Sequence, residues 1–324
     1  MIDSRPTVVD LFAGAGLFSH AFRVSGCRVV RAVEIDPVAA ETYAQNVGTQ
    51  VEVGDVSRLQ PEGRCDILIA GPPCQGFSTL GARRPDDPRN SLCFQVVRWA
   101  KAMRPKVVVI ENVAAFLESD EWQSVRRGLS RLDYEVATFV LDAFDYGVPQ
   151  RRRRSFAIAS RAGTFVAPRQ RRTIRTVRQA WEGLPAEADG RNHHYAPKPS
   201  KIAFARMRVI PPGGDKRDVM KRAPRLVPPS WWKVSCEVTD AWGRMEWDSP
   251  CNTLRTALQN ASKGRYIHPE QHRVISLREA ARLHSIPDEW TFVGLPTQIA
   301  RQIGNSVPPA LGRAVATTVL RHLG

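Results

Sequence analysis

The chain has 324 residues, of which 43% are hydrophobic, so it can bury a sizeable core and is expected to form one large domain and a smaller one. The formal net charge of +15 favours a polyanionic partner, although charge speaks to binding and not to chemistry. Its six cysteines form no CxxC pair, which argues against a disulfide framework or a zinc site and indicates a reducing compartment. No apolar run is long enough to span a membrane, and we expect a cytoplasmic protein.

The first sixty residues predict three strands, each followed by a glycine turn or an acid. Residues 7–12 predict a strand, 13–16 a glycine-rich turn and 17–24 a helix. A second strand over 28–33 ends before Glu34, about twenty residues after the glycines, where nucleotide-binding sheets bind a ribose diol. Asp55 follows a third, short strand. Acids that only cap the following helices are the alternative, but the pattern favours a site for an adenosine-containing cofactor.

The stretch GPPCQGFS, residues 71–78, follows a short apolar run at 65–70 that predicts a buried parallel strand. Cys74 therefore lies at the carboxyl end of a strand, where open α/β sheets bind their ligands. A lone cysteine in a proline-rich turn is more often a small buried hydrophobe. Other residues must decide between the two interpretations.

A second buried strand, over 106–110, ends at Glu111 and places this carboxylate at the same edge as Cys74. Glu111 could act there as a hydrogen-bond donor or general acid. An acid favoured by the N-terminus of a following helix is equally consistent with the pattern.

A hairpin-like pair of strands, 134–141 and 155–160, flanks the four arginines 151–154. If the second strand is antiparallel to the sheet, its start lies at the carboxyl edge of the parallel strands. Alternation along a strand then sends Arg152 and Arg154 to one face. A solvated or phosphate-binding patch is the alternative.

The composition changes after residue 161. Residues 151–232 contain 20 Lys and Arg against 5 acids, a bias that suits phosphate neutralisation. Pro and Gly become frequent and regular periodicity fades, which predicts a smaller irregular domain.

His268 and His272 have ligand spacing, but Pro269 interrupts the helix between them, so we expect no metal. Residues 276–283 predict a helix with a capping box, and 310–320 predict a last helix that packs near the first strand.

Taken in order, these motifs resemble those of the DNA (cytosine-5) methyltransferases over residues 5–160 and 245–320. The matching segments are DLFAGAG (10–16), Glu34, Asp55, GPPCQGFS (71–78), Glu111-Asn112-Val113, the QRRRR run (150–154), REAARL (278–283) and QIGNSVPP (302–309). Two positions depart from the family pattern. Leu17 replaces a common glycine, and 284–286 replace the residues usual after REAARL.

The resemblance implies a Rossmann-like S-adenosylmethionine-dependent methyltransferase fold: an α/β architecture with a mostly parallel sheet, an antiparallel hairpin strand and a small irregular target-recognition domain. It implies a discontinuous catalytic domain, 1–160 and 268–324, with the target-recognition domain at 161–267. The implied activity is sequence-specific transfer of a methyl group from S-adenosylmethionine to carbon 5 of a flipped cytosine. S-adenosylhomocysteine would be the product, and no metal is needed.

The resemblance also assigns residue roles. Cys74 would add to carbon 6 of the base, Glu111 would hold its N3 and amino edge, and Arg154, with Arg152 nearby, would bind the O2 side. The cofactor-binding residues would be Phe12, Gly14, Gly16, Glu34, Ile35, Asp55, Val56, Pro73, Leu92 and Asn305. The DNA-binding residues would be Gln75, Ser78, Thr253, Arg206, Arg208 and Lys216.

The expected partner is double-stranded DNA, within a restriction-modification system whose endonuclease acts on the same site without a stable complex. A monomer away from membranes is expected. Three other functions remain open: a tRNA-methylating relative, a catalytically silent DNA-binding relative, and a nicotinamide-dependent oxidoreductase. The long basic insert favours DNA over tRNA. The oxidoreductase explains Glu34 but leaves GPPCQGFS and QIGNSVPP without a role.

Overall fold

The computed structural model describes residues 3–73, 88–171, 173–232 and 240–324. The chain divides into two compact units. Unit 1 comprises Met1–Tyr146, Arg153–Arg172 and Ser306–Gly324, and unit 2 comprises Gly147–Arg152 and Thr173–Asn305. Residues 268–305, which the sequence assigns to the catalytic domain, thus pack with unit 2. The division into catalytic and target-recognition domains is a functional one and stays a prediction.

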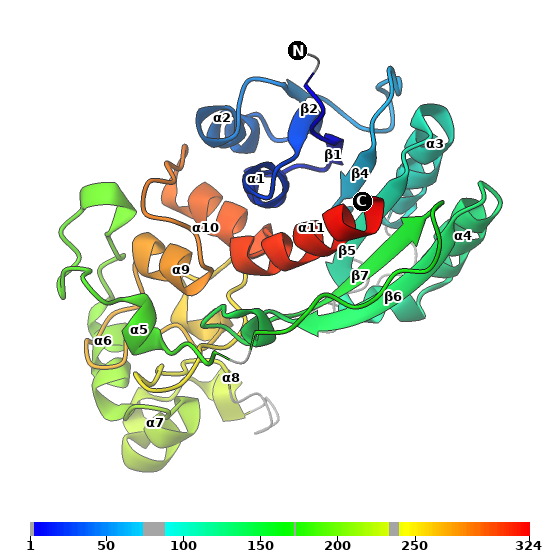
Figure 1. Ribbon diagram of the computed structural model, residues 1–324. Helices are drawn as coiled ribbons and strands as arrows, with labels where there is room; N and C mark the ends of the chain where they lie inside the picture. Colours follow the sequence, from blue (N-terminus) through cyan, green and yellow to red (C-terminus); the bar gives the residue numbers. More distant parts are fainter. Residues whose placement is uncertain (1–2, 74–87, 172, 233–239) are drawn as a thin grey trace. The chain divides into compact units, whose positions relative to one another are not determined.

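Unit 1 is built on a seven-stranded sheet in the order β3-β2-β1-β4-β5-β7-β6 (Figure 1). The strands are β1 (Thr7–Leu11), β2 (Arg28–Glu34), β3 (Val51–Val53), β4 (Ile67–Ala70), β5 (Val107–Val113), β6 (Glu135–Asp142) and β7 (Arg153–Ser160). β1 to β5 pair in parallel, and β7 is antiparallel to both β5 and β6. The predicted mixed sheet with an antiparallel hairpin strand is confirmed.

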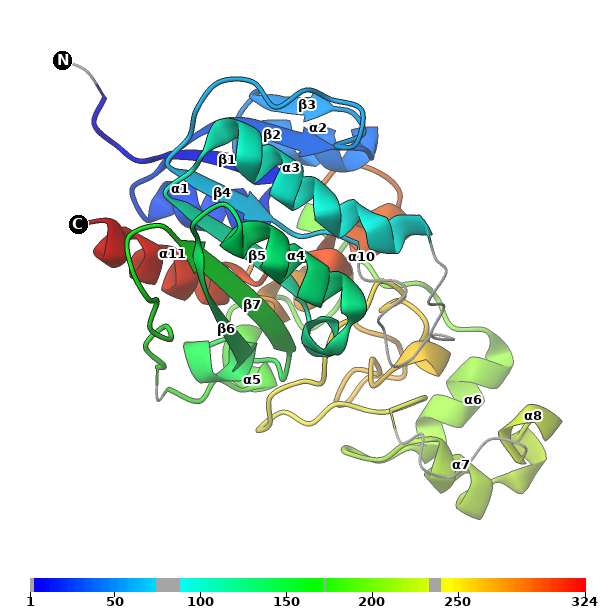
Figure 2. The same ribbon diagram turned by 90° about the vertical axis from the view of Figure 1, so that its right-hand side faces the viewer.

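Helices cover both faces of this sheet, as parallel strands require. One face carries α1 (Leu17–Val24), α2 (Pro37–Asn46) and α11 (Pro309–Leu323), and the other carries α3 (Phe94–Met103) and α4 (Asp120–Ser130) (Figures 1 and 2). β4 is buried throughout because it lies between these layers. The last helix, predicted to pack near the first strand, packs on α1, the helix that follows this strand. Gly312 allows the close approach, since a Cβ there would lie 2.7 Å from the Ala21 Cβ.

A buried polar chain joins the first strand to α1 and α2. Ser19 donates a hydrogen bond to Asp10 (2.7 Å) and accepts one from the Tyr43 hydroxyl (2.9 Å). Burial raises the pKa of Asp10 to about 7 and that of Tyr43 as well. Ser19 occupies the position where a dinucleotide-binding fingerprint has its third glycine. A glycine there could not form the hydrogen bonds that the Ser19 hydroxyl makes with Asp10 and Tyr43.

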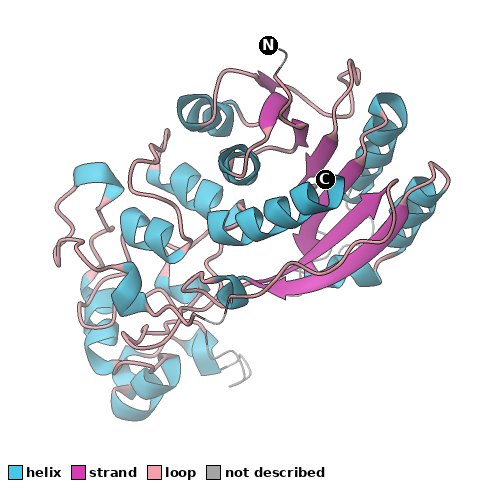
Figure 3. Cartoon of the chain, viewed as in Figure 1, coloured by secondary structure: helices cyan, strands magenta, loops and turns pink. Residues whose placement is uncertain are grey.

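Unit 2 consists of short helices joined by long loops (Figure 3). Its helices are α5 (Val177–Ala180), α6 (Lys201–Val209), α7 (Lys216–Arg222), α8 (Pro229–Trp232), α9 (Leu277–Leu283) and α10 (Pro296–Asn305). The predicted capping box of α9 is confirmed, because Ser276 accepts from the Glu279 backbone and the Glu279 side chain accepts from the Ser276 backbone. None of the helices in the described part of the chain has the length and apolar character that a bilayer crossing requires.

Buried arginines stabilise the loops of unit 2. Arg244 is 2% exposed and donates hydrogen bonds to the carbonyls of Met207, Ile210, His268 and Gln271. Arg278 is 1% exposed and donates to the carbonyls of Asn192, Pro287 and Trp290. Most of these carbonyls lie in loops outside any sheet ladder, although those of Met207 and Pro287 also accept from backbone N–H groups. The guanidinium groups therefore satisfy buried acceptors that would otherwise cost stability.

Candidate active site

A carboxylate and a guanidinium meet at the carboxyl edge of the unit 1 sheet. The register pairs Val113 with Arg154, so β7 begins where β5 ends. The Arg154 Nε lies 3.2 Å from Glu111 Oε1, and the two side chains are 15% and 9% exposed. The sequence prediction that these groups share one edge is confirmed. Their catalytic roles stay predictions.

Asn112 connects this edge to the Gly-Pro-Pro turn. Its side chain is buried, donates to the Pro72 carbonyl (3.3 Å) and accepts from the Val113 backbone (2.8 Å). A Cβ on Gly71 would lie 3.7 Å from Glu111 Oε2, so the turn passes directly beside the carboxylate. Asn112 therefore fixes the backbone two residues before Cys74. The sequence contained Asn112 within a motif but gave it no role, because its partner is 40 residues away.

The predicted residues Cys74, Gln75 and Ser78 lie outside the described residues. Pro73, immediately before them, is half-buried at the end of the described turn.

The predicted cofactor residues gather at the ends of β1 and β2. Glu34 accepts hydrogen bonds from the backbone N–H groups of Gly14 (2.7 Å) and Asp36 (2.8 Å), and burial raises its pKa. Phe12 adopts φ 60°, a left-handed conformation that is uncommon for a bulky residue and signals a constrained turn. Ile35 is 67% exposed just beyond the strand.

These features fit an adenosine-containing cofactor. Gly14 has φ +54°, and nothing lies within 4 Å of where its Cβ would be, so a ligand can approach the backbone there. The exposed Ile35 and the half-buried Phe12 offer apolar surface for a ring at the same edge. In contrast, Gly16 packs tightly, because a Cβ there would lie 2.7 Å from Tyr43.

The remaining predicted cofactor residues of unit 1 are Asp55, Val56 and Leu92. Asp55 accepts from the Ser57 backbone (2.8 Å) and hydroxyl (2.7 Å), and these hydrogen bonds lower its pKa. Val56 is buried, and its carbonyl accepts from the Arg98 side chain. Leu92 is half-buried in the turn before α3.

The other predicted residues lie in unit 2. Arg152 is 1% exposed and donates to the carbonyls of Leu254 (3.0 Å) and Gly304 (2.7 Å). The Thr253 hydroxyl donates to the Arg151 carbonyl (2.7 Å), and Asn305 is exposed at the end of α10. Arg152 thus holds backbone within unit 2, and these contacts give its predicted role at the base no support.

The candidate DNA contacts differ in how far they reach the surface. Arg206 donates to the Leu226 carbonyl and lies over the rings of Trp231 (5.1 Å) and Trp242 (5.3 Å). Lys216 is only 3% exposed. Arg208 is exposed. Among these three, the structure therefore leaves Arg208 as the one whose charge is readily available to a phosphate.

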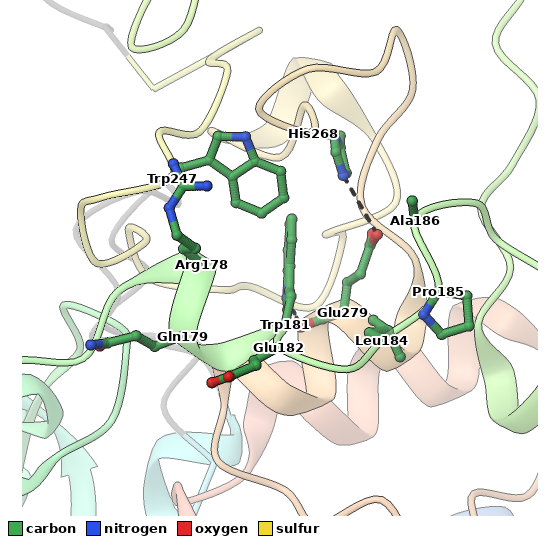
Figure 4. Close-up of a pocket in the computed structure, with 10 residues that line it drawn as sticks. All are labelled: Arg178, Gln179, Trp181, Glu182, Leu184, Pro185, Ala186, Trp247, His268 and Glu279. Carbon is green, nitrogen blue, oxygen red and sulfur yellow. Dashed lines mark hydrogen bonds and ion pairs between the residues drawn. The ribbon is translucent and has the colours of Figure 1, made fainter.

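Unit 2 contains an aromatic pocket that the sequence did not predict. Its volume is about 500 Å³, and Figure 4 shows Trp181, Trp247 and His268 close together among its lining residues. The Trp247 ring centroid lies 5.4 Å from those of both Trp181 and His268. Trp181 stacks on His268 at 5.3 Å and donates its indole N–H to the Glu279 carbonyl (3.0 Å). None of its lining residues is a cysteine. We interpret the aromatic cluster as packing that joins α5 to α9.

His268 itself explains why the histidine pair is a poor metal site. Its Nδ1 accepts from the backbone N–H groups of Glu270 (3.1 Å) and Gln271 (3.0 Å), so that lone pair is already used. Its Nε2 lies 3.8 Å from Glu279.

Comparison with known proteins identifies the family. The profile of the C-5 cytosine-specific DNA methylases matches residues 6–321. The chain belongs to this family. It is 34% identical to the Type II methyltransferase M1.HphI of Haemophilus parahaemolyticus, covering 97% of this chain and 87% of that protein. It is 32% identical to the Type II methyltransferase M.XorII of Xanthomonas oryzae, covering 99% and 86%.

Solved structures agree with the fold. A protein described as a prophage-encoded DNA modification methyltransferase of E. coli superposes with a TM-score of 0.76 at 26% identity, over 98% of this chain and 99% of that one. The Dnmt2 methyltransferase of S. pombe has the same fold, with a TM-score of 0.62 at 20% identity over 98% of each chain. The chain is thus a DNA cytosine-5 methyltransferase with the fold of S-adenosylmethionine-dependent enzymes.

Proposed function

We propose that this protein methylates carbon 5 of a flipped-out cytosine in a short DNA sequence, within a restriction-modification system. The observation that carries the proposal is the Glu111–Arg154 pair beside the Gly-Pro-Pro turn that leads to Cys74. Its similarity to Type II methyltransferases supports the restriction-modification setting. We propose a cytoplasmic monomer, with an endonuclease that acts on the same sequence without a stable complex.

The cofactor would be S-adenosylmethionine, held at the ends of β1 and β2. Glu34 would accept the ribose hydroxyls, Phe12 and Ile35 would flank the adenine, and Asp55 and Val56 would contact its edge. Gly14, Gly16, Pro73, Leu92 and Asn305 would complete the cofactor site. When bound, S-adenosylmethionine supplies the electrophilic methyl group.

The protein's own groups would activate the base. Carbon 5 of cytosine is too weak a nucleophile to accept a methyl group unaided. The Cys74 thiolate would form a bond to carbon 6, which shifts a pair of ring electrons toward carbon 5. Glu111 would hold N3 and the amino group, while Arg154 would bind O2 and stabilise the charge that develops. Loss of the carbon 5 proton and of Cys74 would then restore the aromatic ring.

The reaction needs access to the face of the ring, so the cytosine must leave the duplex stack. Gln75, Ser78 and Thr253 would contact the DNA near the flipped base. Arg208 is our preferred phosphate contact from the target-recognition domain.

The test is incubation of the protein and labelled S-adenosylmethionine with mixed bacterial DNA, followed by base-resolution mapping of 5-methylcytosine. We expect label in cytosine at one short recurring sequence. Label on added tRNA and not on DNA would replace the proposal with the RNA-modifying alternative. Label on neither would favour the silent DNA-binding relative.

Replacing the nucleophile separates chemistry from binding. We expect Cys74→Ala to lower methyl transfer by at least about 10³-fold while DNA binding is retained, because covalent activation of the base is lost. The matched control is Cys27→Ala, since burial raises the pKa of that thiol to about 11 and keeps it unreactive. Near-normal turnover by Cys74→Ala would remove Cys74 from the mechanism.

A further inference from the structure

One face of α4 carries three arginines. A shallow hollow of about 430 Å³ is lined by Gln123, Arg126, Arg127, Ser130 and Arg131. We call these five residues the α4 arginine face. All are exposed, and among the described residues none of its three guanidinium groups forms an ion pair. The face lies on the outer side of the helix, since Trp122, Val125 and Leu129 are buried against the sheet.

The arrangement of charge is not explained by the stability of the helix. The helix dipole favours cations in the last turn, which accounts for one arginine at a gain below about 1 kcal/mol. Further arginines repel one another, and Arg127 and Arg131 are spaced i, i+4, where like charges destabilise a helix. A bound anion relieves this repulsion, and the guanidinium fork matches phosphate oxygens well.

The Arg131 end of the face lies far from the methyl-transfer edge. β6 follows α4 and starts at Glu135, which pairs with Ser160 at the far end of β7. Arg154, the second residue of β7, lies near the other end of the strand, six residues from Ser160. At about 3.3 Å per residue this separation is about 20 Å, the length of the sheet. The neighbouring helix α3 also ends in exposed basic residues, Lys101 and Arg104. Both helices return from the methyl-transfer edge, so their basic ends lie at the opposite edge.

We infer that the α4 arginine face binds the phosphate backbone of a second segment of double-stranded DNA, separate from the segment being methylated. The inference rests on the proposed function. From Gln123 to Arg131 the helix rises about 12 Å, which spans three to four phosphates of one strand at about 3.4 Å per nucleotide. A protein that contacts only phosphates does not need to recognise bases, and the arginines of this face are suited to contacting phosphates.

A second segment is the polyanion this enzyme meets most. Its substrate is a long polymer, so a segment near the one in the active site is present at high effective concentration. Binding both segments would let the enzyme transfer between them without leaving the DNA.

The experiment is a two-duplex capture. A short duplex that contains the methylated sequence is immobilised, the protein is bound to it, and a labelled duplex without that sequence is added. We expect the wild type to capture the second duplex. The triple variant Arg126→Ala, Arg127→Ala, Arg131→Ala should lose capture by at least tenfold, while binding and methylation of the short duplex stay unchanged. The control is Arg64→Ala, Arg313→Ala, Arg321→Ala, which removes the same charge from other exposed positions of unit 1.

Each other result has a distinct meaning. Equal loss of capture in the control would show a general charge effect and overturn the α4 assignment. Capture by the triple variant at the wild-type level would also overturn it, provided its thermal unfolding is unchanged. Capture of labelled RNA but not of DNA would overturn the choice of partner. A wild type that neither binds nor methylates the immobilised duplex would instead contradict the proposed function.

Discussion

In unit 1, Arg154 pairs with Glu111 at the edge of a regular sheet, whereas in unit 2 Arg244 is buried among four backbone carbonyls. The sheet satisfies most of its backbone groups through its ladder, and the Arg154 guanidinium there contacts the Glu111 carboxylate and the carbonyl of the neighbouring Arg153. The loops of unit 2 leave carbonyls without ladder partners, and arginines satisfy them instead. The basic residues of unit 2 therefore include structural arginines as well as arginines that can reach DNA.

The largest effect should come from Glu111→Gln. The amide keeps the size of the side chain and can still accept from Arg154, but it cannot carry the charge that the carboxylate offers. We expect methyl transfer to fall by about 10³-fold, equivalent to about 4 kcal/mol of transition-state stabilisation, with unfolding free energy reduced by about 1 kcal/mol or less. Single-turnover kinetics and thermal unfolding measure the two quantities.

The same substitution elsewhere in the sheet provides the control. Glu52 pairs with Arg31 at 2.7 Å on neighbouring strands, away from the proposed base site. Glu52→Gln should leave methyl transfer unchanged. A similar loss of activity in both variants would mean that the Glu111–Arg154 pair is only structural.

Arg244→Met should lower mainly the unfolding free energy, whereas Glu111→Gln lowers mainly methyl transfer. It removes the hydrogen bonds to Met207, Ile210, His268 and Gln271 and leaves these acceptors buried. We expect the unfolding free energy to fall by about 3 kcal/mol. Burial lowers the pKa of Arg244 to about 10, so the guanidinium stays charged at neutral pH. Mild alkali therefore does not reproduce the effect of the substitution. Chemical denaturation measures the loss, and an unchanged midpoint would contradict the structural role.

His268, whose carbonyl accepts from Arg244, should make the fold sensitive to acid. Burial lowers its pKa from 6.5 to about 4. Between pH 6.5 and about pH 4 the His268 imidazole is protonated in the unfolded chain but neutral in the folded chain. Its contribution to the unfolding free energy is therefore fully present above pH 6.5 and is lost as the pH falls. We expect a loss of about 2 kcal/mol between about pH 7.5 and about pH 5.

The control for this pH dependence is His268→Asn, whose side-chain oxygen can still accept from the Glu270 and Gln271 backbones. The variant should have a flatter pH profile of unfolding free energy. If the profiles of the two proteins coincide, His268 titrates normally in the fold.

Local patterns predicted most of unit 1 and the start of α9 in unit 2. The helix over 17–24 is found as Leu17–Val24, and the strand over 28–33 is found one residue longer. Apolar runs, glycine turns and the Ser276 capping box are properties of neighbouring residues, so sequence alone reveals them. The shared edge of Glu111 and Arg154 followed from topology, because an antiparallel strand must begin where parallel strands end.

Long-range partners could not be predicted. Arg152 contacts carbonyls 102 and 152 residues away, and the Arg206 side chain packs against Trp231 and Trp242. An arginine has the same pattern in a sequence whether it faces a phosphate or a carbonyl. The aromatic pocket around Trp181 likewise depends on contacts between segments nearly 100 residues apart.

The smallest effect should distinguish two arginines of α6, Arg206 and Arg208, that are only two residues apart. Arg208→Ala should weaken DNA binding modestly and lower the slope of log affinity against log salt by about 0.9, because one phosphate contact is lost. Arg206→Ala should leave that slope unchanged and lower the unfolding free energy by about 1 kcal/mol, since it removes ring contacts and a carbonyl bond. Titrations at several salt concentrations, with unfolding curves for both variants, measure the contrast. A lower salt slope for Arg206→Ala with normal stability would mean that this guanidinium leaves its tryptophans to bind DNA, and the structural interpretation of the arginines in unit 2 would not extend to α6.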